Sequence, residues 1–303
     1  MTRLPRGIIS VVQTPFLSNL TLDLESLRRL IADALDADVD GFLVPAVASE
    51  VGTLTGEERQ QILACVLETT RSRVPVIAGA SSPAPQISRD LGLQAEEMGA
   101  SAWLIAVPDP LYRSPDDILP FFKAATEGIS LPLVIQDLQF NGPGLTLDDM
   151  RKLSDALPQL AGWKIETVPA GPKYSLVRQA FGPRCHISGG WAVPQLIEAL
   201  DRGVDAMIPE SAMIRIYKKI YRRYQAGNRG SATELFRRLQ PILAFTNQEI
   251  LTSIAFFKRL LVRKGIFRED AVRVTGFQWD RWNERIAEEL IALYLQLEQE
   301  TAA

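Results

Sequence analysis

The sequence predicts an α/β protein, a (β/α)8 TIM barrel with a C-terminal helical extension. Three observations favour this fold class. Continuous apolar runs recur eight times before residue 211, as expected for strands covered on both faces. Amphipathic stretches with recognisable helix starts separate these runs. From about residue 211 to 300 the pattern is helical throughout. A doubly wound sheet is the main competitor, but eight βα units favour a barrel.

The apolar runs are spaced by roughly 20 to 34 residues. We expect strands within residues 7–13, 41–46, 74–80, 102–108, 131–138, 160–166, 185–190 and 205–210. Three helix starts show an N-cap residue with acidic residues in the first turn, at Thr55, Ser114 and Thr146.

The expected barrel covers residues 1–225, and the helix that begins near Ile216 would be its eighth. Residues 226–303 would form the extension, and it would pack on the barrel because no linker rich in Pro, Gly or Ser separates the two. A stripe of apolar residues in this extension is interpreted as helix packing: Phe245, Ile250, Phe256 and Phe257.

Composition excludes several classes of function. A net charge of −3 gives no electrostatic footprint for nucleic acid, and no apolar run is long enough to span a membrane. The two cysteines, Cys65 and Cys185, favour a reducing cytoplasm over a disulfide framework. With His186 as the single histidine, the chain offers no cluster of metal ligands. We therefore expect a cytoplasmic protein with a small-molecule partner.

Lys164 lies in the sixth apolar run, AGWKIETVP, where a buried lysine needs a partner or a chemical role. Chemistry in a (β/α)8 barrel occurs at the C-terminal ends of the strands, and Lys164 lies near that end of its strand. Glu166 faces the same side, because side chains alternate along a strand. The other residues expected at this end of the barrel are Val47, Ala48, Ser49, Glu50, Tyr112, Gln136, Ser188, Gly189, Gly190, Ile208 and Glu210.

An ordered set of short motifs covers nearly the whole chain. They are GIISVVQTPF (7–16), DVDGFLV (38–44), SEVGTLTGEER (49–59), RVPVIAGA (73–80), VPDPLYRSP (107–115) and GWK (162–164). Together they resemble the dihydrodipicolinate synthase / N-acetylneuraminate lyase family of Schiff-base class I aldolases. The resemblance implies a tetrameric barrel, or at least a homo-oligomer (dimer or tetramer). It also implies that Lys164 forms an imine with a 2-oxo acid, usually pyruvate.

The chain departs from the family pattern in the residues that would carry protons. The family's GTTGE turn reads AVASE at residues 46–50, so Val47 replaces a threonine hydroxyl. Gln136 replaces the family's catalytic tyrosine, and the arginine expected soon after it is missing near Asn141. Tyr112 alone remains of the implied proton relay. True dihydrodipicolinate synthase activity is therefore not expected.

Lys164 has two interpretations, a structural salt bridge or a Schiff-base nucleophile. The nucleophile must be neutral near pH 7, and desolvation on an apolar barrel floor favours that form. Glu166 and Glu210 leave three alternatives. An ionised glutamate near the lysine would hold it as ammonium in an inactivated site. A desolvated glutamate would replace the missing tyrosine as acid and base. One or both could instead point into the loops.

The remaining candidates have weaker signals. Gln136 can orient a substrate by hydrogen bonds but cannot act as an acid. Tyr112 is either a relay group or a packed aromatic at a subunit contact. Gly189 and Gly190 allow close backbone approach, so a carboxylate-binding nest is possible there. His186 is interpreted as a core histidine rather than a catalyst.

Two functions follow from these observations. The first is a lyase of the aldolase or dehydratase type that acts on pyruvate or another 2-oxo acid through Lys164, with no metal or organic cofactor. The alternative is a non-catalytic barrel that binds 2-oxo acids and has lost the proton relay.

Overall fold

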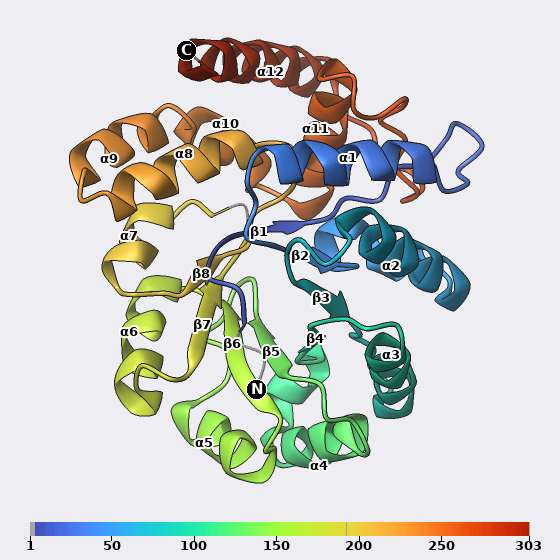
Figure 1. The fold of residues 1–303 in the computed structure, drawn as a ribbon, viewed down its shortest axis with the longest axis vertical. Helices are drawn as coiled ribbons and strands as arrows, with labels where there is room; N and C mark the ends of the chain where they lie inside the picture. Colours follow the sequence, from blue (N-terminus) through green and yellow to red (C-terminus); the bar gives the residue numbers. More distant parts are fainter. Residues whose placement is uncertain (1–3, 192, 303) are drawn as a thin grey trace.

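The computed structural model describes residues 4–191 and 193–302 and contains a closed parallel barrel (Figure 1). Each strand pairs with its neighbours in the chain, and β1 pairs with β8 to close the barrel. The strands are β1 Gly7–Val11, β2 Gly41–Val44, β3 Val76–Gly79, β4 Ala102–Ala106, β5 Leu133–Leu138, β6 Leu160–Glu166, β7 His186–Gly189 and β8 Ala206–Met207. Each expected run contains one of these strands, so the predicted fold class is confirmed.

Figure 1 shows helices α1 to α8 as a ring around the strands. They are α1 Leu24–Asp36, α2 Gly56–Thr70, α3 Pro85–Glu97, α4 Pro115–Thr126, α5 Leu147–Ala156, α6 Ala170–Phe181, α7 Leu196–Asp201 and α8 Ile214–Gln225. Short 3-10 helices lie in the loops after β2 and β4, at η1 Val47–Ser49, η2 Val51–Thr53 and η3 Asp109–Arg113. None of the helices in the described part of the chain has the length and apolar character to cross a membrane.

The three predicted helix starts are present. Thr55 accepts a hydrogen bond from the Glu58 backbone N–H at 3.1 Å, while the Glu58 carboxylate accepts one from the Thr55 N–H at 3.0 Å. This reciprocal capping box begins α2. Thr146 caps α5 through the Asp149 N–H. Ser114 precedes α4 without a capping hydrogen bond from its side chain, and Pro115 supplies the fixed φ of the first turn.

The strands divide the apolar residues into two cores. One fills the barrel and includes Ile9, Val11, Leu43, Ile77, Leu104, Val134, Ala206 and Ile208. The other lies between the strands and the surrounding helices, and it contains Trp163 and Ile165 of β6. Because side chains alternate along a strand, Lys164 and Glu166 point the opposite way, into the barrel.

The segment after α8 contains four more helices, α9 Arg229–Arg237, α10 Gln240–Thr246, α11 Ile250–Arg263 and α12 Arg281–Ala302. Figure 1 shows them gathered beside α8 and α1. The expectation that the chain is helical throughout from about residue 211 to 300 is wrong for residues 264–280, which are irregular. Gly265 ends α11 in the left-handed conformation, with φ of +71°. The expected domain boundary after residue 225 stays a prediction.

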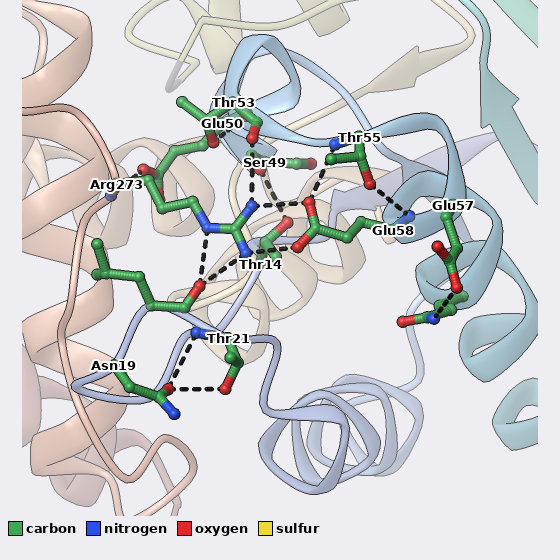
Figure 2. Close-up of polar contacts among 12 residues, drawn as sticks. Thr14, Asn19, Thr21, Ser49, Glu50, Thr53, Thr55, Glu57, Glu58 and Arg273 are labelled. Carbon is green, nitrogen blue, oxygen red and sulfur yellow. Dashed lines mark hydrogen bonds and ion pairs between the residues drawn. The ribbon is translucent and has the colours of Figure 1, made fainter.

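Arg273 ties this irregular segment to the barrel, and Figure 2 shows its contacts. Its guanidinium donates two hydrogen bonds, of 2.6 and 2.7 Å, to the Glu58 carboxylate of α2. It also donates to the carbonyls of Leu20 and Thr53 and lies 4.1 Å over the Phe16 ring. One side chain thus joins the β1–α1 loop, the turn after β2 and the start of α2.

Candidate active site

A small cavity of about 40 Å³ lies at the C-terminal ends of the strands, where (β/α)8 enzymes carry their chemistry. Its polar and charged lining side chains are Gln136, Lys164, Glu166, Glu210 and Ser253. Its apolar lining consists of Val11, Ala46, Val47, Ala48, Leu138, Phe140, Trp191, Ile208 and Ile250. Of the residues expected at this end of the barrel, the lining includes Val47, Ala48, Gln136, Lys164, Glu166, Ile208 and Glu210.

Lys164 and Glu166 form a buried ion pair in this cavity. The side chains are only 4% and 5% exposed, and the Lys164 Nζ lies 2.5 Å from the Glu166 Oε2. A buried ammonium without a partner would be strongly unfavourable, and Glu166 provides the partner. The third alternative for Glu166, that it points into the loops, is therefore wrong. The ion pair and the acid/base alternatives both remain compatible with this contact.

Gln136 belongs to the same hydrogen-bonded group. It lies on β5 directly beside Lys164 in the strand register, and its Nε2 donates to the Glu166 Oε2. The same carboxylate oxygen therefore accepts from an amide and an ammonium. Gln136 thus positions the carboxylate, as a neutral amide can.

Gly190 makes room for the Glu166 carboxylate. A Cβ at this glycine would lie 2.2 Å from the Glu166 Oε1 and 3.1 Å from the Lys164 Cε. Any side chain here would displace the carboxylate, so the glycine supports the site sterically. Gly189 faces away from the pair, since a Cβ there would meet the Tyr174 hydroxyl and Met207. The carboxylate-binding nest expected at these glycines stays a prediction.

Glu210 follows β8 and lines the cavity, as does the apolar Ile208 two residues earlier. Glu210 is 5% exposed. The Oε2 accepts a hydrogen bond from the Ala212 N–H, whereas the Oε1 accepts none from the described residues. Burial raises the pKa of Glu210 to about 8. The two glutamates in the cavity thus have different electrostatic surroundings.

The turn after β2 forms an apolar wall and a structural anchor. Val47 and Ala48 line the cavity, as expected. Ser49 is fully buried, and its hydroxyl bonds to the Ala46 N–H and the Val12 carbonyl, so it does not face the cavity. Glu50 pairs with Lys258 of α11, and both side chains are buried. Burial lowers the pKa of Lys258 to about 8.

Tyr112 does not line the cavity, so the structure does not bring it to Lys164. Its hydroxyl donates to the Asp137 Oδ1 at 2.9 Å, on the outward side of β5. Burial, and then the Asp137 charge, raise the pKa of Tyr112. The Asp137 Oδ2 accepts from Lys173 at 2.5 Å. Tyr112 in this chain therefore holds a loop in place through Asp137.

Ser188 and His186 are also outside the cavity. The Ser188 hydroxyl lies in the barrel at 3.4 Å from the Trp163 carbonyl and has no exposed surface. His186 begins β7, and burial lowers its pKa to about 4, so it is neutral near pH 7. It lines a separate pocket together with residues such as Arg6 and Leu160, at the opposite ends of the strands.

Several lining residues were missed by sequence reasoning. Phe140 and Trp191 pack edge to face with ring centroids 4.7 Å apart. Together with Ile250 they line both the cavity and an outer pocket of about 200 Å³. The interpretation of Ile250 as helix packing was therefore incomplete. No local pattern identifies these residues, because α11 reaches the barrel only through the tertiary fold.

The arrangement combines an amine, a carboxylate in contact with it and a second carboxyl group in one small space. The cavity lining contains no arginine among the described residues. In the same part of the chain, no group of three or more His, Cys, Asp or Glu side chains is placed to hold a metal ion. The site can therefore supply amine and acid/base chemistry from its own residues.

Comparisons with known proteins agree with this fold. A sequence model of the dihydrodipicolinate synthetase family matches residues 4–275. The L-2-keto-3-deoxyarabonate dehydratase of Azospirillum brasilense is 28% identical over 262 residues, which are 84% of each chain. The crystal structure of dihydrodipicolinate synthase from Rhodopseudomonas palustris superposes with a TM-score of 0.87 at 22% identity, covering 97% of this chain and all of the other.

N-acetylneuraminate lyase from Fusobacterium nucleatum has the same fold, with a TM-score of 0.83 at 19% identity over 96% of this chain and 97% of that one. The family match spans most of the present sequence. The chain therefore belongs to the dihydrodipicolinate synthetase family, which confirms the predicted family and the predicted class of enzyme, a carbon–carbon or carbon–oxygen lyase.

Proposed function

We propose that this protein is a Schiff-base lyase of 2-oxo acids that acts through Lys164. The observation that carries the proposal is the position of Lys164, whose amine lies in a small buried cavity in contact with a carboxylate. An amine in such a place can attack the ketone of a 2-oxo acid, and loss of water gives an iminium ion. The iminium then accepts electrons from a breaking bond at the neighbouring carbon.

Glu166 is the proposed base of the next step. Its carboxylate removes a proton from C3 of the iminium, which leaves an enamine. In a dehydration, the enamine electrons expel the hydroxyl group on C4, which takes up a proton and leaves as water. Glu166 can return the proton that it has just removed. Among the described residues that line the cavity, Glu166 is the carboxylate in contact with the Lys164 amine. Val47 and Gln136 also line the cavity but carry no transferable proton.

Dehydration is favoured over condensation with an aldehyde acid for two reasons. The dehydratase of Azospirillum brasilense matches this chain over most of its length. The cavity also lacks an arginine among the described residues, so it offers no fixed cation for the carboxylate of a second substrate. A homo-oligomeric assembly, dimer or tetramer, is proposed from the resemblance and is measurable by light scattering.

A non-catalytic barrel that binds 2-oxo acids is the second candidate. It is favoured by the short Lys164–Glu166 contact, because an ionised partner stabilises the ammonium and suppresses its attack on a ketone. Only a protein that forms an imine gains mass irreversibly on reduction, and this difference separates the two functions.

The test is trapping with borohydride. The protein is incubated with pyruvate and with a panel of longer 2-oxo acids, reduced, digested and mapped by mass spectrometry. We expect an adduct on Lys164 and none on Lys173, which is also buried but donates to Asp137 and to the Pro143 and Leu145 carbonyls. The Lys164→Met variant should gain no adduct. No adduct across the whole panel would reject the lyase and favour the binding protein.

A further inference from the structure

Glu210 lies in the same cavity as Lys164 and Glu166 but has no role in the steps above. It follows β8 and forms a parallel bridge with Val11 of β1, so the barrel wall fixes its backbone. Two residues earlier, Ile208 belongs to the apolar core inside the barrel. Glu210 therefore places a carboxyl group on an otherwise apolar side of the cavity.

The two carboxyl oxygens of Glu210 differ. Oε2 accepts from the Ala212 N–H, while Oε1 has no hydrogen-bond partner among the described residues. The residue is 5% exposed, so bulk water does not supply the missing partner freely. An unpartnered buried carboxylate oxygen is costly, and the cost is removed if the oxygen carries a proton and donates to a ligand.

The charged and titratable groups around Glu210 leave it without a cation. Burial raises the pKa of Glu210, while the Ala212 N–H, then the charge of Lys264 and the Met213 N–H, lower it. Lys264, at the end of α11, does not pair with Glu210, because its Nζ donates to the Ala212 carbonyl and pairs with Glu298 at 3.1 Å. Lys164 pairs with Glu166. Tyr217 of α8 and Tyr294 of α12 face Glu210, and the pKa of each is raised, by burial and by nearby carboxylates.

Burial consequently dominates, and it raises the pKa of Glu210 from 4.5 to about 8. The cavity also needs this neutral state for electrostatic reasons. A 2-oxo acid brings its own negative charge, and the lining offers no arginine among the described residues. Glu166 already offsets the charge of Lys164. A second ionised glutamate would repel the incoming carboxylate.

We propose that Glu210 is kept as a neutral carboxylic acid and that its Oε1 hydroxyl donates a hydrogen bond to the carboxylate of the bound 2-oxo acid. The identity of the ligand rests on the proposed function. The two glutamates then have different roles. Glu166, which contacts the Lys164 amine and the Gln136 amide, moves protons, whereas Glu210 keeps its proton and binds the ligand. Environments that separate two carboxyl groups in this way allow one cavity to hold an acid and a base.

The first measurement needs no substrate. Difference infrared spectra between the wild type and Glu210→Gln are recorded at about pH 6.5 and about pH 9.5, on either side of the expected titration. We expect a protonated-carboxyl band at the lower pH that is missing in the variant and fades in the wild type at the higher pH. A carboxylate band at both pH values would overturn the proposal.

The second measurement is the affinity for pyruvate across the same pH range. In the wild type we expect affinity to fall about tenfold per pH unit once the pH exceeds about 8, because the donor is lost. Glu210→Gln keeps an N–H donor, so its affinity for pyruvate should not show this fall, the limb above pH 8. Glu210→Leu should bind ten- to a hundredfold more weakly than the wild type below about pH 7, and its affinity should not fall above pH 8. Glu249→Gln, in the outer pocket, is the control and should keep the wild-type profile.

The outcomes separate this inference from the proposed function. Trapping of pyruvate on Lys164 with an affinity that lacks the limb above pH 8, or with a limb that persists in Glu210→Gln, would overturn the role of Glu210 alone. Failure to trap any 2-oxo acid would overturn the proposed function and the ligand assigned to Glu210, while the infrared band would still report the protonation of its carboxyl group.

Discussion

The contact of 2.5 Å between Lys164 and Glu166 has opposite effects on two steps of the proposed reaction. As an ion pair, the contact stabilises the charged amine, which cannot attack a ketone. In the proposed mechanism, the same carboxylate removes a proton from C3 of the bound acid once an imine has formed. The contact therefore disfavours attack by the free amine and favours the proton removal that follows imine formation.

The first prediction concerns Glu166→Gln. The amide keeps the shape of the side chain and removes its basicity, so we expect trapping on Lys164 to be no slower than in the wild type. Exchange of the pyruvate methyl protons in D₂O should fall by about 10² or more, because it requires a base at C3. Exchange is followed by NMR without knowledge of the natural substrate.

Gly190→Ala is a second test of the same role that leaves the charge in place. A methyl group here would lie 2.2 Å from the Glu166 Oε1 and would move the carboxylate. Exchange should again fall while trapping persists. If Glu166→Gln trapped pyruvate faster and exchanged its protons at the wild-type rate, Glu166 would be an ion-pair partner only.

At the scale of elements, residues 264–280 show how an irregular segment is fixed by few side chains. Arg273 supplies contacts to three parts of the barrel, as Figure 2 shows. Its backbone N–H donates to Glu50, which also pairs with Lys258 of α11. The turn that carries Val47 and Ala48 is therefore held from the C-terminal side of the chain.

The second prediction is that Arg273→Met lowers the free energy of unfolding by roughly 1.5–3 kcal/mol, the usual value of hydrogen bonds to a charged group. Chemical denaturation at neutral pH measures the loss. Arg268→Met is the matched control, because Arg268 and its partner Glu25 are 48% and 63% exposed. That variant should lose less than about 1 kcal/mol. Equal losses in the two variants would show that the contacts of Arg273 stabilise the fold no more than an exposed ion pair does.

The same variant should change the dependence of stability on pH. Arg273 lowers the pKa of Glu58 from 4.5 to about 2. A carboxyl group with a lowered pKa stabilises the fold above its unfolded value and loses this contribution as the pH falls towards the folded value. The difference in the free energy of unfolding between wild type and Arg273→Met should thus be largest above about pH 5 and decrease below it.

At the scale of the whole molecule, the chain has the barrel of its family, and the resemblance implies that the proton-carrying residues differ. The third prediction is that condensation of pyruvate with aspartate semialdehyde will be very slow or absent. Val47 and Gln136 carry no proton, Tyr112 bonds to Asp137 away from the cavity, and losses of proton transfer commonly cost on the order of 10² to 10⁴ in rate. Steady-state kinetics measures it, and turnover within tenfold of dihydrodipicolinate synthases would contradict it.

Much of the fold could be read from the sequence because its signals are local. Thr55 and Thr146 cap helices through residues three positions away, and a continuous apolar run identifies a strand covered on both sides. The irregular segment before α12 was missed because the contacts that stabilise it are not local. Arg273 stabilises it through partners more than two hundred residues distant in the chain, which no local pattern reveals.

The sequence by itself determined the barrel, the inward direction of Lys164 and the shared face of Glu166, because alternation along a strand is a local property. Only the tertiary structure decided which groups meet at the amine. It placed Gln136 on the carboxylate, turned Tyr112 towards Asp137, and brought Ile250 to the cavity. It also raises the pKa of Glu210, since the pKa of a buried carboxyl depends on its burial and on every charge packed around it, whatever its place in the chain.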